Sequence, residues 1–183
     1  MSQKYKIIDQ QGLYFLTLSV VGWVDVFIRQ EYREILFDSL DFCRKNKGLH
    51  LNAYVIMTSH LHLIVSCDLP HKLSEVTRDF KKYTARRILE TIEKANWESR
   101  KDWMLLVFRH HARNHANREE YMFWQEGNHP IEIWTAAVFD QKVEYIHNNP
   151  VKEGWVLHPG DYIYSSASNY LTGSGVFDVE VLE

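Results

Sequence analysis

The hydrophobic residues of this chain change their spacing in a fixed order, and that order limits the folds available to it. Three segments rich in β-branched and aromatic residues predict strands, at residues 13–21, 49–57 and 60–67. Two segments with apolar side chains at helical spacing predict helices, at residues 30–46 and 73–95. The order strand, helix, strand, strand, helix is that of the split βαβ, ferredoxin-like arrangement. The sequence therefore predicts an α+β fold with an antiparallel sheet and helices on one face.

The second half of the chain is less regular. Residues 103–108 fit either a strand or a helix, and short strand-like pieces surround Gly127 and Pro130. Residues 136–148 indicate a helix that should stop near Asn149, because the residue before Pro150 is pushed out of helical geometry. Residues 176–182 alternate apolar and acidic side chains, which predicts an edge strand.

Composition excludes several classes of protein. The 183 residues are 45% hydrophobic, which rules out a disordered chain, and they predict a single domain over residues 1–183. Two cysteines without CxxC spacing exclude a disulfide framework and a cysteine-based zinc module. The N-terminus lacks an apolar signal-peptide core, and the most apolar stretch is too short to cross a bilayer. We therefore expect a cytoplasmic protein with no membrane partner.

The pair His60 and His62 is the first candidate site. Alternate residues of a strand point to the same face, so the two imidazoles lie together while Leu61 points the other way. Two imidazoles on one strand are suitable ligands for a divalent ion. On spacing alone, exposed or structural histidines are the simpler interpretation.

The segment YIHNNPVKEGW, residues 145–155, is the second candidate. Asn149 follows Tyr145 by four residues, so a phenol and an amide project from the same face of a helix. The simpler interpretation is a core tyrosine with an asparagine that caps the helix.

Basic residues gather on the helix predicted at residues 73–95. We call five of them the basic stripe: Arg78, Lys81, Lys82, Arg86 and Arg87. Such a run is either a solvated face or a surface that binds phosphates without reading sequence. The chain has a net charge of −3, but residues 78–118 carry +6 and the remainder −9. The overall acidity therefore does not exclude nucleic acid. We expect an inserted or extended basic segment at about 96–120 and an acidic tail at about 174–183.

His111 and His115 could bind zinc if they lie on one helix, but neither an HExxH glutamate nor a third ligand at standard spacing accompanies them. The favoured interpretation of the cluster at residues 109–115 is a basic, exposed or DNA-facing loop.

Several of these motifs, taken in order, resemble one family. HLH within AYVIMTSHLHLIV resembles the HUH motif (His, hydrophobic, His) of single-tyrosine, IS200-like transposases. FKKYTARRI resembles the following helix of the REP-associated tyrosine transposases, and FWQEGNHP, YIHNNPVKEGW and DYIYSSASNY resemble their C-terminal half. The resemblance covers roughly residues 14–170 and is weakest at residues 96–118.

The resemblance implies a ferredoxin-like fold in which the tyrosine helix lies over the HUH strand. It implies that Tyr145 is the nucleophile and that His60, His62 and Asn149 hold a divalent metal, Mg²⁺ or Mn²⁺. Asn148 and Gln141 remain alternatives to Asn149.

The function implied is that of a metal-dependent endonuclease and strand transferase (transposase) that forms a 5′-phosphotyrosine on single-stranded or hairpin DNA. A catalytically inactive or domesticated DNA-binding relative is the alternative. A small-molecule phosphoesterase would need a second catalytic HxH or HxT/S pair, which the sequence lacks. The expected assembly is a monomer or homodimer in a bacterial cytoplasm, associated with the nucleoid when acting.

Overall fold

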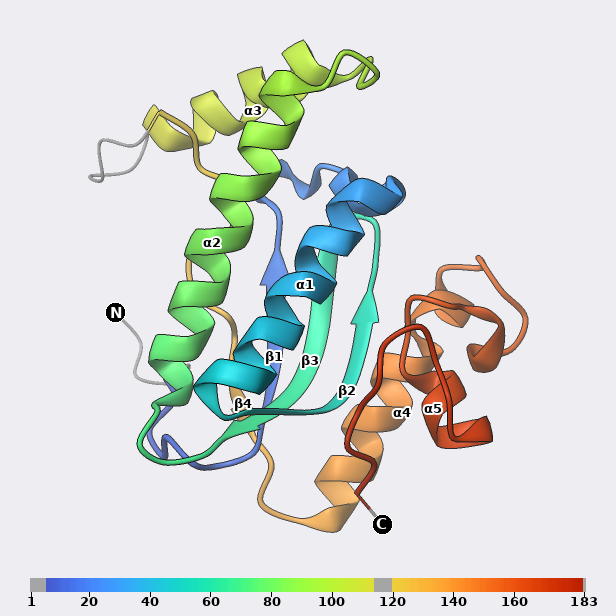
Figure 1. The fold of residues 1–183 in the computed structure, drawn as a ribbon. Helices are drawn as coiled ribbons and strands as arrows, with labels where there is room; N and C mark the ends of the chain where they lie inside the picture. The colour runs from blue at the N-terminus through green and yellow to red at the C-terminus, as the bar shows by residue number, and fades with distance from the viewer. Residues whose placement is uncertain (1–5, 114–119, 183) are drawn as a thin grey trace.

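A four-stranded antiparallel sheet forms the centre of the protein (Figure 1). The computed structural model describes residues 6–113 and 120–182. The strands are β1 (Tyr14–Ser19), β2 (Leu49–Ile56), β3 (His60–Cys67) and β4 (Ile131–Glu132), in the spatial order β2-β3-β1-β4. This order confirms the predicted α+β, ferredoxin-like arrangement, with β1 and β3 at its centre.

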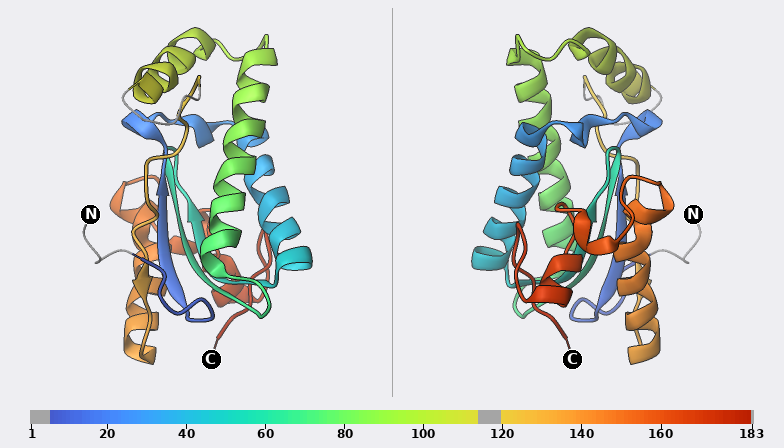
Figure 2. Two further views of the ribbon diagram at one scale, coloured as in Figure 1. Left: turned by 90° about the vertical axis from the view of Figure 1, so that its left-hand side faces the viewer. Right: turned by 90° about the vertical axis from the view of Figure 1, so that its right-hand side faces the viewer.

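Helices cover both faces of the sheet, as Figure 2 shows. On one face lie α1 (Gln30–Lys47) and α2 (Leu73–Lys94), packed on side chains such as Leu18 and Leu61. On the other face lies α4 (Ala136–Lys152), whose Val143 and Ile146 pack on a separate cluster that includes Phe15, Val55 and Ile64. Because neighbouring residues of a strand point to opposite faces, each central strand serves both clusters.

The sequence locates the first turns and caps well. Gly48 ends α1 in the left-handed conformation, with a φ of 58°. Thr58 and Ser59 form the tight turn between β2 and β3, where the Met57 amide donates to the carbonyl of His60 over 2.8 Å.

Residues 101–113 resolve the first ambiguity of the second half, since they form the helix α3 (Lys101–Arg113) rather than a strand. Its start is held by Glu98, a fully buried carboxylate that pairs with Arg100 over 2.8 Å and accepts a hydrogen bond from Tyr32 over 3.3 Å. His115 and Arg118 lie outside the described residues, so the suggested pairing of His111 with His115 stays untested.

The prediction that the tyrosine helix stops near Asn149 is wrong, because α4 continues through Pro150 to Lys152. Proline has no N–H to donate, so it costs a helix one hydrogen bond. Pro150 lies in the last turn of α4, so this loss is confined to the end of the helix. Pro150 is also buried against the rest of the chain. The helical backbone at Asn149 keeps this residue in phase with Tyr145, which matters for the site.

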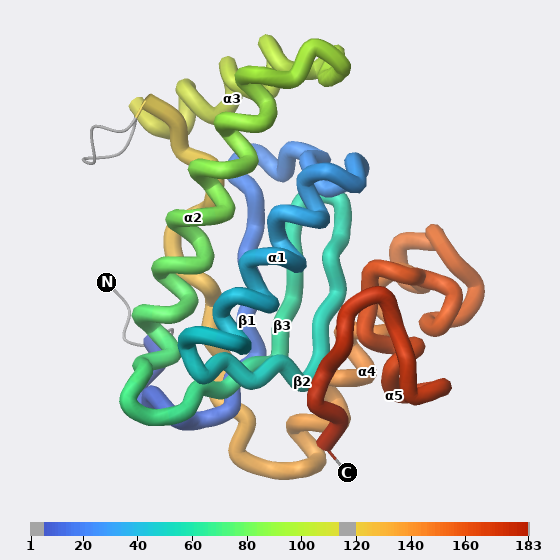
Figure 3. Tube along the Cα trace, in the orientation of Figure 1, coloured from blue at the N-terminus to red at the C-terminus, as the bar shows by residue number. Residues whose placement is uncertain are grey.

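The predicted edge strand at residues 176–182 is also wrong. After η4 (Pro159–Asp161) and α5 (Ala167–Thr172), this tail runs without regular secondary structure beside β2 (Figure 3). Among the described residues of the tail, the Glu180 amide makes the one backbone hydrogen bond to that strand, to the carbonyl of Leu51 over 2.9 Å. Phe177 stacks on Phe37 at 5.1 Å between ring centroids, so side-chain packing replaces a ladder.

Two short 3-10 turns, η2 (Val21–Trp23) and η3 (Val26–Ile28), connect β1 to α1. The stretch at residues 123–125 forms an isolated bridge between Trp124 and Val20 rather than a strand. Within residues 6–113 and 120–182, every helix is too short or too polar to cross a membrane.

The contact between the tail and β2 predicts a pH dependence of stability. His50 lies between two carboxylates, with Nε2 2.7 Å from Asp68 Oδ2 and Nδ1 2.7 Å from Glu180 Oε2. Hydrogen bonds to Asp68 and Glu180 raise the pKa of His50. Its stabilising contribution should be complete below the unfolded pKa of about 6.5 and should fade as pH rises through the raised folded pKa.

The measurement is the melting-temperature difference between the wild type and His50→Gln across that pH range. We expect the difference to shrink with rising pH. His158→Gln, at an exposed position, serves as the control. A difference that grows with pH would contradict the assignment.

Candidate active site

Strand β3 carries His60 and His62 on the face of the sheet that α4 covers. Leu61 and Leu63 alternate with them and enter the opposite cluster under α1 and α2. The two imidazole rings lie 5.0 Å apart between centroids. The prediction that the pair shares one face is confirmed by this geometry.

His62 is 4% exposed and fixed by its cross-strand neighbour. Thr17 is its partner in the register of β1 and β3, and its Oγ1 lies 2.9 Å from His62 Nδ1. In the tautomer that donates from Nδ1 to Thr17, the Nε2 lone pair remains available. Over the part of the chain that the structure describes, this buried Nε2 has no hydrogen-bond partner. A buried polar atom without a partner is costly unless a ligand satisfies it.

Burial keeps both imidazoles in the neutral form that binds metals. Burial, with smaller contributions from the neighbouring His60 and Lys142, lowers the pKa of His62 to about 3. Burial also lowers the pKa of His60, against the opposing effect of the Glu153 carboxylate. Neutral imidazole with a free lone pair is the species that coordinates a divalent ion.

Helix α4 presents Tyr145 to this histidine pair. The Tyr145 ring meets the His62 ring edge to face at 5.2 Å and the Phe15 ring at 5.8 Å, and the side chain stays 39% exposed. The phenol is thus held beside the imidazoles while remaining open to an incoming substrate. The tyrosine helix therefore lies over the HUH strand, as predicted.

The phase of α4 separates the candidates for a third ligand. At about 100° per residue, Asn149 lies between Tyr145 and the buried Ile146, on the side that faces the sheet. Gln141 and Asn148 lie on the other side of Tyr145, away from Ile146. Asn149 is 8% exposed, whereas Gln141 is exposed. Helix phase and burial thus favour Asn149.

Two lysines beside Tyr145 were not identified from the sequence. Lys152 Nζ lies 5.2 Å from the Tyr145 ring centroid, and Lys142 Nζ lies 6.0 Å from it. Lys142 precedes Tyr145 by three residues and Lys152 follows it by seven, so both lie on the same side of the helix as the tyrosine. This spacing could have identified them from the sequence. Thr17 was missed because its role depends on strand register, which has no local signature.

The donors suit a divalent ion, although they include only two classical metal-binding side chains. Among the described residues, no group of three or more His, Cys, Asp or Glu side chains could hold a metal. The two neutral imidazoles, of which His62 keeps a buried Nε2 without a partner among the described residues, nevertheless fit a partial, open coordination shell. Helix phase makes Asn149 the candidate for a third ligand. Such an open site leaves positions for water and phosphate oxygens.

The basic stripe lies on the other side of the sheet from Tyr145, because α2 packs on the opposite cluster (Figure 2). Lys82 and Arg86 are exposed there, and Arg86 and Arg87 pair with Glu90 over 3.8 and 3.3 Å. Arg78 pairs with Asp79 over 3.1 Å. A role in DNA binding stays a prediction, and it would concern DNA other than the strand at Tyr145.

Lys81 differs from the rest of the stripe. Its ammonium points inward and donates to the carbonyls of Gln125 and Gly127 over 2.8 and 2.7 Å. Burial lowers the pKa of Lys81 to about 8. Its observed contacts anchor the segment that leads to β4.

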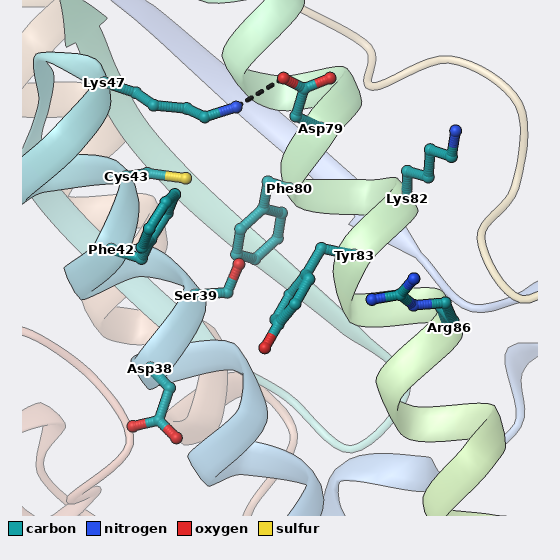
Figure 4. A pocket seen from close by; sticks show the side chains of 10 residues that line it. All are labelled: Asp38, Ser39, Phe42, Cys43, Lys47, Asp79, Phe80, Lys82, Tyr83 and Arg86. Atoms are coloured by element: carbon teal, nitrogen blue, oxygen red, sulfur yellow. Dashed lines mark hydrogen bonds and ion pairs between the residues drawn. The ribbon is translucent and has the colours of Figure 1, made fainter.

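A cavity of about 480 Å³ lies between α1 and α2 (Figure 4). The rings of Phe42, Phe80 and Tyr83 line it, with Lys82 and Arg86 on its α2 side. It is on the same side of the sheet as the basic stripe and is therefore separate from the site at Tyr145.

Comparison with known proteins bears on the family resemblance and on the fold. A family model described as "Transposase IS200 like" matches residues 24–108. The predicted resemblance to IS200-like transposases is confirmed over this stretch, and the match supports a transposase-type, DNA-processing function. The matched stretch includes His60 and His62 but ends before Tyr145.

One solved structure extends the likeness in fold beyond that stretch. A REP-associated tyrosine transposase bound to a REP hairpin is 20% identical, with a TM-score of 0.66, covering 100% of this chain and 98% of that chain. At this identity the likeness shows a shared fold. A proposed transposase from Deinococcus radiodurans R1 is 19% identical, with a TM-score of 0.42, covering 81% of this chain and 95% of that chain. No curated protein matches the chain.

The contact between Thr17 and His62 predicts an effect on metal affinity. Thr17→Val removes the hydroxyl that orients the imidazole, so Mn²⁺ affinity should fall by about 10- to 100-fold, the usual cost of losing such a partner. Thr17→Ser keeps the hydroxyl and should bind almost as the wild type does. Calorimetric titration of each variant with Mn²⁺ measures the effect, and equal affinities for Val and Ser would refute it.

Proposed function

We propose that this chain is a metal-dependent single-stranded DNA endonuclease and strand transferase with Tyr145 as its nucleophile. The observation that carries the proposal is the contact of the Tyr145 ring with the His62 ring, whose buried Nε2 lacks a partner among the described residues. A nucleophile beside an open metal site is the arrangement that phosphoryl transfer needs.

The ligands proposed for the metal are His60, His62 and Asn149. A divalent ion held there, Mg²⁺ or Mn²⁺, would polarise the scissile phosphate and offset the charge that develops on its oxygens. Thr17 holds the His62 ring in its orientation. Burial keeps both imidazoles unprotonated, so they do not need to lose protons before binding.

Tyr145 attacks the phosphorus in line. The bond from its phenolic oxygen to phosphorus forms while the bond to the 3′ oxygen breaks, and the bonding pair leaves on that oxygen. The phenol releases its proton to solvent, and the departing oxygen takes one up as a free 3′-OH. The product is a 5′-phosphotyrosine, which a second 3′-OH reverses to join strands.

Lys142 and Lys152 are proposed to hold the phosphate beside the phenol. Both ammonium groups lie within about 6 Å of the Tyr145 ring and can donate to phosphate oxygens.

The substrate class proposed is single-stranded DNA next to a hairpin. A helix-borne tyrosine needs open access to the phosphate in line, which an unpaired strand provides. The structural relative is bound to a REP hairpin, which makes hairpin DNA the natural first substrate to test.

The test of the nucleophile is covalent capture. Labelled hairpin DNA with single-stranded flanks, incubated with the protein and Mn²⁺, should give an adduct that survives denaturation. Tyr145→Phe should abolish this adduct. Tyr83→Phe, at a tyrosine of similar exposure on α2, should keep it. Binding without an adduct in the wild type, on DNA selected for tight binding, would favour the inactive DNA-binding relative.

The lysines give a second, quantitative prediction. Lys142→Ala and Lys152→Ala should each slow adduct formation by about tenfold or more, because each removes a charge-assisted contact to phosphate. Lys142→Arg and Lys152→Arg keep the charge and should retain most of the rate. The readout is the initial rate of adduct formation at saturating DNA.

The basic stripe gives a third prediction. Lys82→Ala combined with Arg86→Ala should weaken hairpin binding and flatten its dependence on salt. Because these residues lie across the sheet from Tyr145, the rate from the bound complex should stay unchanged. A wild-type salt slope in the double variant would exclude the stripe from the DNA interface.

A further inference from the structure

Trp23 is an exposed aromatic residue in a backbone conformation that tryptophan rarely adopts. Its φ is 53° and its side chain is 59% exposed. The preceding Gly22 also has a left-handed φ, of 62°. A bulky side chain at positive φ is strained, and an exposed indole returns little to folding. Such strain is commonly found at binding sites, where the surrounding structure imposes it.

The turn that carries Trp23 is fixed from two sides. The Val20 amide donates to the Ser59 carbonyl over 2.9 Å, and the Phe27 amide donates to the Thr58 carbonyl over 2.8 Å. These acceptors directly precede His60, so the turn and the histidine pair are tied together.

Helix α3 supports the turn from behind. A Cβ added at Gly22 would meet Val107 Cγ1 at 3.0 Å and His111 Nε2 at 3.4 Å. This close approach leaves little room for any residue other than glycine. Helix α3, in the segment that least resembles the family, therefore supports the turn that carries Trp23.

Trp23 stands at the end of a row of rings that crosses the candidate site. Its ring lies 5.6 Å from that of His60, which lies 5.0 Å from His62, which in turn lies 5.2 Å from Tyr145. The proposed metal ligands therefore lie between the nucleophile and an exposed indole. A strand whose phosphate sits at Tyr145 and the histidines would pass its neighbouring nucleotide over Trp23.

We propose that Trp23 stacks on the unpaired base of a nucleotide adjacent to the scissile phosphate. This inference rests on the proposed function, and it adds a specificity-determining contact to it. Every base offers a π-face, so an indole accepts any sequence. In a duplex both faces of a base are already covered by its neighbours, so the contact selects unpaired DNA.

The test is a thermodynamic cycle in a Tyr145→Phe background, which prevents cleavage. Hairpins with randomised single-stranded flanks are selected for binding to this protein, and the tightest is resynthesised with one abasic position at a time. Trp23→Gly removes the ring while suiting the left-handed backbone. It should weaken binding of the intact DNA by about 5- to 150-fold, the effect of one stacked base.

Coupling between variant and DNA decides the outcome. At one flank position, the abasic DNA should bind the parent and Trp23→Gly equally, because the stacking partner is already gone. Trp23→Phe keeps an aromatic ring, so it should bind the intact DNA almost as tightly as the parent does. It should lose affinity at the same abasic position as the parent. Trp103→Gly, at a tryptophan of 52% exposure on α3, should show no coupled position.

Three results would overturn the proposal. The first is an unchanged affinity of Trp23→Gly for the intact DNA, and the second is an equal loss of affinity from parent to Trp23→Gly on every abasic DNA. The third is binding by the parent that does not depend on the flank. Melting temperatures show whether the glycine variant is folded, and Trp23→Phe answers the question if it is not. Covalent capture by protein with Tyr145 intact is measured separately. If no adduct forms but the coupling at Trp23 is found, the nuclease proposal is rejected and the stacking contact is kept. If the adduct forms but the coupling is absent, only the proposal for Trp23 is rejected.

Discussion

The packing of α4 against the second face of the sheet is the contact on which the candidate site depends. Val143 and Ile146 enter the cluster formed by Phe15, Val55 and Ile64, and this seating sets the rotation of the helix. Tyr145 precedes Ile146 by one residue, so it emerges at the margin of the buried cluster, half covered, against His62. A small rotation of α4 would either bury the phenol or carry it away from the imidazoles. The reactive geometry is therefore a consequence of ordinary apolar packing.

The two central strands, β1 and β3, present apolar core residues on one face of the sheet and polar residues of the candidate site on the other. Residues of β1 and β3 that point to α1 and α2 are mostly aliphatic and belong to the larger cluster. Residues of the same strands that point to α4 include Thr17, His60 and His62, which are polar and form part of the candidate site. Polar groups on this face are tolerated because they pair across the strands, as Thr17 does with His62. The Nε2 of His62, which has no partner in the described part of the chain, is the atom that a ligand would satisfy.

Regular spacing made part of this arrangement predictable. The alternation around Leu61 placed His60 and His62 on one face, and the four-residue interval placed Asn149 beside Tyr145. The strand and helix order gave the fold. Long-range geometry was not accessible: no local pattern tells that α2 and its basic stripe face away from Tyr145, or that Thr17 stands opposite His62. The helix end predicted from Pro150 was wrong because burial of this proline in the last turn of α4 outweighs its preference against helical geometry. The strand predicted at residues 176–182 was wrong because alternating apolar and acidic residues do not by themselves form the hydrogen bonds of a strand pair.

The edge of the sheet at β2 is closed by the chain's own C-terminal part. The Ile56 amide donates to the Tyr164 carbonyl, the Ser166 amide donates to the Tyr54 carbonyl, and the Glu180 amide donates to the Leu51 carbonyl. A strand from another molecule would have to displace these contacts before pairing there. Lengthening the sheet across two copies at this edge is therefore disfavoured.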